Sequence, residues 1–202
     1  MPTPPRYLEP YVAASQRHGG GFGSLLWASP ATQEARFDAI ARACDFEGKS
    51  VLDAGCGRAD LLDFFIGRGI VLDHYVGLEA VEALAEAARQ KQRTGCMIVQ
   101  ADFVAEPSRL FAAADVVVFS GSLNTLDEAG FYATLRMAFD ASAGELVFNF
   151  LSSPELAAAR YLTWHDARNV VEFLKALPGA ENVRLVNDYL EGDCTVGVGW
   201  TS

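Results

Sequence analysis

Short apolar segments alternate with amphipathic segments along most of the chain. The apolar segments are rich in valine, leucine, isoleucine and phenylalanine, as expected of strands that are buried on both faces of a sheet. The amphipathic segments repeat their apolar residues with helical periodicity, which predicts helices with one buried face. The expected strands are residues 49–55, 74–79, 96–102, 115–122 and 145–150. The expected helices are residues 60–69, 80–92, 127–139 and 166–177.

The last part of the chain breaks this alternation. Residues 182–190 and 194–200 flank the short polar segment "EGD" and indicate an antiparallel hairpin. Strands that alternate with helices favour a mostly parallel sheet covered on both faces, so the hairpin should leave one antiparallel strand at an edge. The prediction is an α/β fold with a doubly wound, mostly parallel, seven-stranded Rossmann-like sheet, an antiparallel last strand and an N-terminal helical extension.

The N-terminal region differs in composition from the rest. Half of the eight prolines fall within the first ten residues, and the glycine-rich segment "HGGGFG" follows at 18–23. We expect this start to be extended or disordered. Ser29 and Pro30 fit the N-cap and first position of a helix whose buried side includes Phe37 and Ile40. The prediction is a flexible extension over residues 1–28, which could serve as a lid, and a main domain over residues 29–202.

Composition and charge exclude several functions. The chain has 202 residues, of which 50% are hydrophobic and 21% charged, and this suits one globular domain. Its formal net charge of −10 opposes binding to nucleic acid and to anionic membranes. The four cysteines are scattered without a CxxC pair, so we expect no metal site. The start lacks the apolar core of a signal peptide and no segment has membrane-spanning length, so we expect a cytoplasmic protein.

Acidic residues stand at the ends of the first three expected strands. They are Asp53, Glu79 and Asp102. In doubly wound folds ligands bind at these strand ends, and an acidic residue that ends the second strand commonly holds two ribose hydroxyls. Asp102 could accept a hydrogen bond from an adenine amine, with the Phe103 ring beside it. Each residue could instead cap the following helix, but the series favours a pocket for an adenosine-containing ligand.

The turn after Asp53 helps to distinguish two such ligands. A dinucleotide site requires GxGxxG and places the pyrophosphate at a helix N-terminus. Here the small residues are Gly55, Gly57 and Ala59, and the carboxylates of Asp53 and Asp60 flank the turn. These negative charges would repel a pyrophosphate. They would tolerate the amino-acid end and the sulfonium of S-adenosylmethionine.

The segment "VLDAGCG" resembles the first signature of class I S-adenosylmethionine-dependent methyltransferases. The resemblance implies that Glu79 binds ribose and that Asp102 and Phe103 contact adenine. It also places "VVVFSGSLN" at the fourth-strand segment of that family, and Ala59 departs from its third glycine. The chain also carries a W-x-S…Q-x-x-RF pattern at residues 27–37. With this pattern, "GCGxxDL" and "SGSLN", it resembles a small bacterial subgroup of that family.

Other candidate site residues lie before and after this core. Arg36 falls beside a buried stripe and could reach the cofactor's carboxylate or the substrate, or pair with a buried aspartate. Trp27 could cover the pocket and contact substrate, or anchor the core. Ser120 and Gly121 are expected to offer backbone groups to the cofactor, and Asn124 to face substrate.

The three histidines are the candidate general bases. His74 opens a strand at the wrong end of the sheet and is expected to be structural. His165 could face a cleft, although we expect it at the surface, and His18 lies in the glycine-rich segment.

The sequence thus predicts a methyltransferase that uses S-adenosylmethionine and acts on a small-molecule acceptor. Three alternatives remain open at this point. They are a protein that binds the cofactor without transferring methyl, an NAD-dependent oxidoreductase, and a protein-interaction module with an acidic face.

Overall fold

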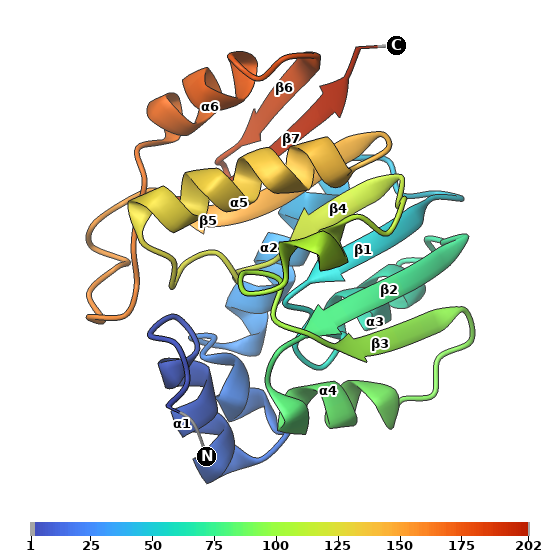
Figure 1. Cartoon of the computed structure of the whole chain (residues 1–202), viewed down its shortest axis with the longest axis vertical. Helices are drawn as coiled ribbons and strands as arrows, with labels where there is room; N and C mark the ends of the chain where they lie inside the picture. The colour runs from blue at the N-terminus through green and yellow to red at the C-terminus, as the bar shows by residue number, and fades with distance from the viewer. Residues whose placement is uncertain (1–2, 202) are drawn as a thin grey trace.

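The computed structural model describes residues 3–201, which form a seven-stranded sheet with the strand order β3-β2-β1-β4-β5-β7-β6 (Figure 1). The strands are β1 (Ser50–Ala54), β2 (His74–Glu79), β3 (Cys96–Gln100), β4 (Val116–Phe119), β5 (Glu145–Leu151), β6 (Ala180–Val186) and β7 (Asp193–Trp200). The helices are α1 (Glu9–His18), α2 (Pro30–Ala43), α3 (Asp60–Gly67), α4 (Glu82–Arg89), α5 (Glu128–Ala141) and α6 (Ala167–Lys175), with short 3-10 helices η1 (Phe22–Leu25) and η2 (Pro107–Leu110).

The sheet confirms the predicted fold class. Strands β1 to β5 pair in parallel, and β7 pairs antiparallel with both β5 and β6. The predicted antiparallel last strand is therefore confirmed as β7, and it lies one position inside the sheet, next to the edge strand β6. Seven of the eight residues of β7 are buried, whereas every residue of β6 is exposed or half-buried. The polar residues Glu181, Asn182 and Arg184 suit β6 to the exposed edge.

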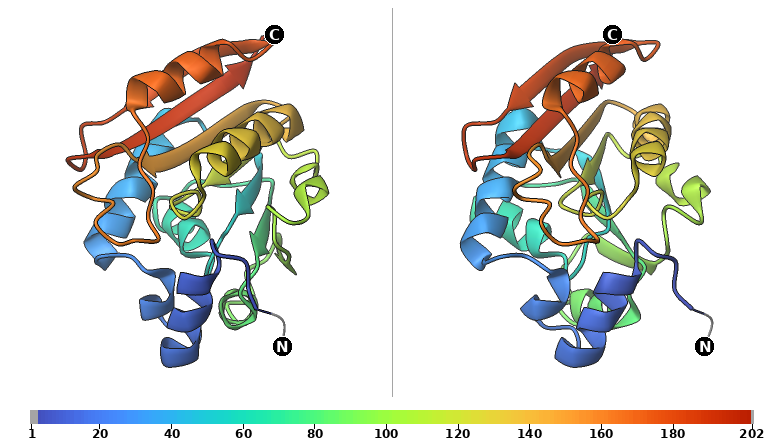
Figure 2. Two further views of the ribbon diagram at one scale, coloured as in Figure 1. Left: turned by 60° about the vertical axis from the view of Figure 1, so that its left-hand side comes forward. Right: turned by 90° about the vertical axis from the view of Figure 1, so that its left-hand side faces the viewer.

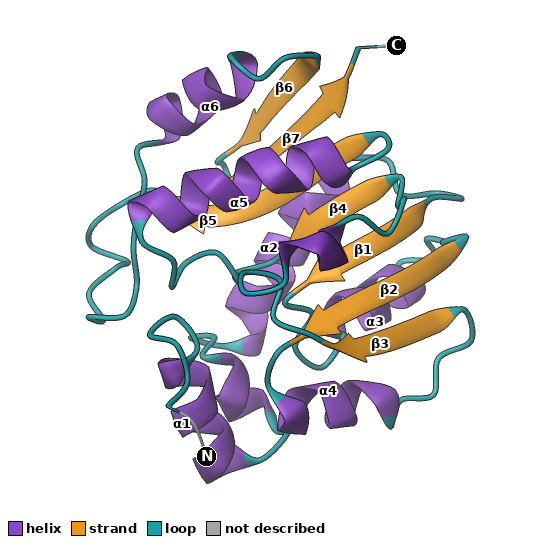
Figure 3. Ribbon diagram, in the orientation of Figure 1, coloured by secondary structure: helices purple, strands orange, loops and turns teal. Residues whose placement is uncertain are grey.

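Helices cover both faces of the sheet (Figure 3). One apolar cluster joins the sheet to residues of α2, α3 and α4, and the other joins it to α5 and α6. The predicted start of α2 is confirmed, because Ser29 Oγ accepts a hydrogen bond from the Thr32 amide at 3.1 Å and Thr32 Oγ1 accepts one from the Ser29 amide at 3.1 Å. This reciprocal cap satisfies two amides that the helix leaves unpaired.

The N-terminal segment is more regular than its composition indicates. Residues 9–18 form α1 within the segment predicted to be a flexible extension, and Pro10 lies in its first turn, where a missing amide hydrogen breaks no helical bond. Figures 1 and 2 show α1 and η1 beside the carboxyl ends of the parallel strands. The division into residues 1–28 and 29–202 stays a prediction. No helix within residues 3–201 has both the length and the apolar content needed to cross a membrane.

Candidate cofactor and acceptor site

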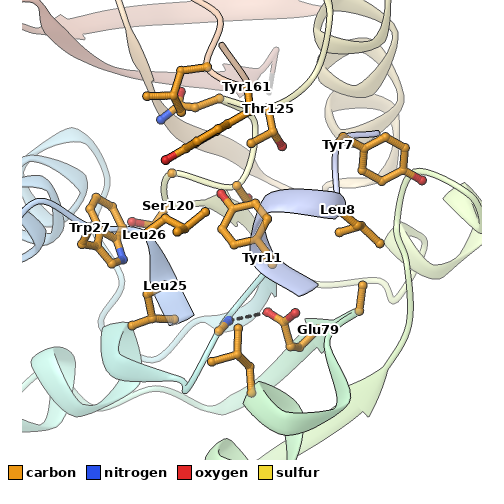
Figure 4. Close-up of a pocket in the computed structure, with 18 of the residues that line it drawn as sticks. Tyr7, Leu8, Tyr11, Leu25, Leu26, Trp27, Glu79, Ser120, Thr125 and Tyr161 are labelled. Atoms are coloured by element: carbon orange, nitrogen blue, oxygen red, sulfur yellow. Dashed lines mark hydrogen bonds between the residues drawn. The ribbon is translucent and has the colours of Figure 1, made fainter. Parts of the chain in front are cut away.

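A cavity of about 220 Å³ opens where β1, β2 and β4 end (Figure 4). Its walls come from these strand ends, from the segment after β5, and from α1 and η1. Ten of the eleven residues predicted from the sequence line it, namely Trp27, Arg36, Gly55, Gly57, Glu79, Asp102, Phe103, Ser120, Gly121 and Asn124. Segments far apart in the chain therefore converge on one site.

The turn after β1 requires its glycines. Gly55 and Gly57 have φ angles of 80° and 56°, in the left-handed region. A Cβ atom on Gly57 would lie 2.6 Å from Cδ2 of Leu25. Ala59, which replaces the third glycine of the resembled motif, also has a left-handed φ of 55° and precedes α3 as its N-cap residue. The alanine thus keeps the conformation that a glycine would adopt there.

Glu79 is buried at the end of β2 and is held by two backbone amides. Its Oε2 accepts a hydrogen bond from the Gly57 amide at 2.8 Å (Figure 4), and its Oε1 accepts one from the Val81 amide at 2.7 Å. Burial raises the pKa of this carboxyl, and the backbone hydrogen bonds oppose that shift. An ionised carboxylate has about four acceptor positions, so about two remain for hydroxyl groups in the cavity.

Asp53 does not line the main cavity. It is 1% exposed within β1 and lines a small adjoining cavity behind the glycine turn. Its Oδ2 accepts a hydrogen bond from the Tyr75 hydroxyl at 2.5 Å, while its Oδ1 has no partner among residues 3–201. Burial raises the pKa of Asp53 to about 7, and the charges of Glu79 and Asp60 add to the shift. The residue therefore lies beneath the site and not in its wall.

Asp102 is engaged by the N-terminal segment. Its Oδ1 accepts hydrogen bonds from the amides of Val104 at 2.9 Å and Ala105 at 3.2 Å, and its Oδ2 accepts one from the Tyr7 hydroxyl at 2.7 Å. Burial and the Asp102 carboxylate raise the pKa of Tyr7. Phe103 lies next to Asp102 in the cavity wall. The residues predicted to contact adenine are thus adjacent, but a tyrosine hydroxyl already occupies one oxygen.

Sequence reasoning missed the contribution of α1. Tyr7, Leu8 and Tyr11 line the cavity, and Figure 4 shows the Tyr11 ring above Glu79. Burial, followed by the charge of Glu79, raises the pKa of Tyr11. The four-residue interval between the two tyrosines matches one helical face, but the prolines around it favoured an extended segment.

Arg36 pairs with a buried aspartate. Its Nε donates to Oδ2 of Asp193 at 2.6 Å, and its guanidinium lies 4.8 Å from the centroid of the Trp27 ring. The aspartate pairing that the sequence left open is therefore present, and a cofactor role for Arg36 stays a prediction. The Trp27 ring packs against Gly121, where a Cβ atom would lie 2.9 Å from Trp27 Cη2.

The segment after β4 uses several of its polar groups internally. The Gly121 amide donates to Asn149 Oδ1 at 2.8 Å. It is therefore already bonded within the protein, whereas the sequence predicts that Gly121 offers a backbone group to the cofactor. Asn124 Oδ1 accepts from the Leu151 amide at 3.3 Å. Ser120 Oγ is buried without a partner among the described residues and remains available.

Of the described residues that line the cavity, none is a histidine. His18 and His74 are exposed, and His74 bonds to Asp73. His165 is 7% exposed and stacks on Phe131 with ring centroids 3.7 Å apart, so its expected surface position is wrong. Desolvation lowers the pKa of His165, which favours its neutral form. No group of three metal-binding side chains converges within residues 3–201.

Comparisons with known proteins agree on one family. A family model described as "Methyltransferase domain" matches residues 30–184. A solved structure of DhpI in complex with SAH is similar with a TM-score of 0.69 and 19% identity, over 96% of this chain and 94% of that chain. The magnesium protoporphyrin IX methyltransferase ChlM from Synechocystis PCC 6803 with bound SAH has a TM-score of 0.65 and 14% identity, over 85% and 84% of the two chains. No curated protein matches the sequence.

At these identities the structural likeness shows the fold, whereas the family model spans well over half of the chain and includes the glycine turn and all three acidic strand ends. The chain belongs to the class I S-adenosylmethionine-dependent methyltransferase family.

Proposed function

We propose that this protein transfers a methyl group from S-adenosylmethionine to a small-molecule acceptor. The observation that carries the proposal is a single cavity with two unlike walls. One wall holds the Glu79 carboxylate beside the glycine turn, and the other is formed by Leu156, Tyr161 and Leu162 from the segment after β5. A cofactor and an apolar acceptor would therefore meet in one cavity.

The residues present fit the cofactor. The acceptor positions left on Glu79 suit the two ribose hydroxyls, and the glycine turn lets the amino-acid end approach the backbone. Phe103 and Asp102 would hold the adenine, provided that the Tyr7 hydroxyl shares or releases Asp102 Oδ2. Ser120 Oγ, which is buried and unpartnered among the described residues, supplies a further polar contact.

When bound, the cofactor supplies a methyl group that its sulfonium already activates. The protein's own task is to align the acceptor and to keep water away, and Tyr11, Trp27 and Leu26 close the cavity for this purpose. The raised pKa of Tyr11 makes its hydroxyl a hydrogen-bond donor and a poor base. An acceptor that reaches this site in a nucleophilic form would need no base from the protein.

Isothermal titration tests the cofactor assignment. We expect S-adenosylmethionine and S-adenosylhomocysteine (SAH) to bind with one site per chain, and NAD to give no heat. A folded sample that binds NAD but neither sulfur ligand would refute the proposal and restore the oxidoreductase alternative.

A labelling experiment tests the acceptor class. The protein is incubated with methyl-labelled cofactor and a cell extract that has been separated into macromolecules and small molecules. We expect label to enter the small-molecule fraction with wild-type protein and not with the Glu79→Ala variant. Label that enters only the macromolecular fraction would show that the acceptor is a protein or a nucleic acid.

A further inference from the structure

A second surface cavity beside the first gathers three arginines. Arg6, Arg17 and Arg160 line it, together with the oppositely charged Glu9. All three arginines are exposed, and none forms an ion pair within the part of the chain that the structure describes. Because the chain as a whole has a net charge of −10, such a group of unpaired cations is a local exception.

The two cavities lie on two faces of α1. Pro10, Ala13 and Arg17 follow intervals of three and four residues along one face of α1, and Arg6 lies four residues before Pro10, in the turn that leads into the helix. Tyr7, in the same turn, and Tyr11, in α1, line the first cavity. Helix α1 therefore separates an aromatic wall from a cationic one.

Two side chains connect the cavities. Leu26 and Tyr161 line both of them. Tyr161 follows Arg160 directly in the segment after β5, and Figure 4 shows its ring on the far side of Tyr11 from Glu79. A molecule that rests against Tyr161 in the first cavity can therefore extend past Leu26 to the arginines.

The charges in the two cavities differ in kind. Among the described residues that line the first cavity, Arg36 is the one cation, and Asp193 neutralises it. An anion inside that cavity would also face Glu79 and Asp102. The second cavity offers three guanidinium groups that form no ion pair among the described residues, against one carboxylate, although Arg17 Nε donates to the Ala13 carbonyl. Guanidinium groups bind oxyanions well.

From this arrangement we propose that the acceptor is an amphipathic anion, which inserts an apolar body into the first cavity and leaves a carboxylate, phosphate or sulfonate group at Arg6, Arg17 and Arg160. The inference rests on the proposed function and names the substrate class for the same site. The arginines act as positioning residues, because they hold the acceptor without touching the reacting atoms.

A matched pair of probes tests the inference. The anionic probe is 8-anilinonaphthalene-1-sulfonate, and the neutral probe is N-phenyl-1-naphthylamine, which has the same ring system without the sulfonate. Both are titrated calorimetrically into the SAH-saturated full chain. The variant is Arg6→Ala/Arg17→Ala/Arg160→Ala, and its charge-matched control is Arg136→Ala/Arg168→Ala/Lys175→Ala, which removes three exposed cations from α5 and α6.

We expect the anionic probe to bind wild-type protein at one site and to lose about tenfold in affinity in the cavity variant, with no comparable loss in the control. The neutral probe should bind both variants and wild type alike. Raising NaCl from about 0.05 M to about 0.5 M should weaken only the anionic probe, because salt screens exposed charges.

Equal affinity of the anionic probe for wild type and the cavity variant would overturn the inference, as would an equal loss for the neutral probe. Absence of anionic binding to wild-type protein would do the same. SAH binding is measured separately in every sample, so a chain that binds no SAH refutes the proposed function instead.

Discussion

The Glu79 carboxylate both accepts backbone hydrogen bonds in the turns after β1 and β2 and lines the cavity. Each of its oxygens accepts one backbone amide, and the residue also lines the cavity in which ribose hydroxyls would bind. Removal of the side chain would leave two buried amides unpaired, a loss that costs stability as well as affinity. A glutamine keeps the shape and one acceptor oxygen, so it retains one of the two backbone hydrogen bonds that an alanine would lose, while its NH2 group faces the other amide.

We expect Glu79→Gln to weaken SAH binding by about 10- to 100-fold, as for the loss of hydrogen bonds to a charged group. The melting temperature of Glu79→Gln should fall less than that of Glu79→Ala. Calorimetric titration and a melting curve measure the two quantities, with Glu172→Gln on the exposed side of α6 as control. Unchanged affinity in Glu79→Gln would show that this carboxylate does not bind the ribose.

Asp53 makes stability depend on pH. Its pKa rises from an ordinary value of 3.8 in the unfolded chain to about 7 in the folded protein. Between these values the folded state holds a proton that the unfolded state has released, so stability falls as pH rises through this window. Above about pH 7 the carboxyl is ionised in both states and the loss is complete.

The Asp53→Asn variant removes this ionisation, and the Tyr75 hydroxyl can still donate to the asparagine oxygen. We expect its free energy of unfolding to rise relative to wild type as pH increases from about 5 to about 8. Urea unfolding at several pH values measures the difference, with the exposed Asp140→Asn as control. Parallel curves for Asp53→Asn and wild type would contradict the raised pKa.

At the scale of elements, α1 is the part of the site that the ligand must accommodate. The Tyr7 hydroxyl bonds to Asp102, and η1 places Leu25 against Gly57. A bound adenosine would lie between α1 and the strand ends. The lid that the sequence suggested for residues 1–28 therefore has a defined contact at Tyr7, although its movement stays a prediction.

We expect Tyr7→Phe to speed amide hydrogen exchange in α1 by about fivefold, because it removes the hydrogen bond from the Tyr7 hydroxyl to Asp102 that holds this segment against the strand ends. SAH should slow exchange in the same helix in wild-type protein. Exchange followed by mass spectrometry compares α1 with β4, which should not change. Slow exchange in α1 that responds neither to the variant nor to SAH would argue that α1 is a fixed wall.

At the scale of the whole molecule, Arg36 and Asp193 join α2 to β7 across most of the chain. The pair is largely buried, with side-chain exposures of 12% and 0%, and Asp193 also accepts the Tyr189 hydroxyl. A buried ion pair adds little over an apolar pair of the same shape, but one partner alone is costly. Position 36 therefore contributes to stability whether or not it contacts the cofactor.

We expect Arg36→Met to lower the free energy of unfolding by about 3 kcal/mol, and Arg36→Met/Asp193→Asn to regain at least half of this loss. Urea unfolding completes the double-mutant cycle, and Arg68→Met, from an exposed pair with Asp38, should cost about 0.5 kcal/mol. SAH titration of the double variant tests the cofactor role. Normal affinity there would assign Arg36 to structure alone.

Sequence patterns determined the sheet, its helices and most of the cavity wall. Apolar periodicity reports burial, and burial on two faces is what a central parallel strand requires, so β1 to β5 could be located within a few residues. The acidic strand ends and the glycine turn could be grouped because parallel strands end at one edge of a sheet. These features depend on residues that are near each other in sequence or on a regular topology.

Only the tertiary structure decided where β7 lies in the sheet and which polar side chains of the site are already bonded to other residues. It placed β7 inside the sheet, bonded Arg36 to Asp193, moved Asp53 behind the turn and brought Tyr7 to Asp102. Each of these contacts joins distant segments, and the geometry of such a contact depends on the packing of the whole domain, which local propensity does not encode. The same packing brings Arg160 to the cavity that Arg6 and Arg17 line, a contact that no interval in the sequence reveals.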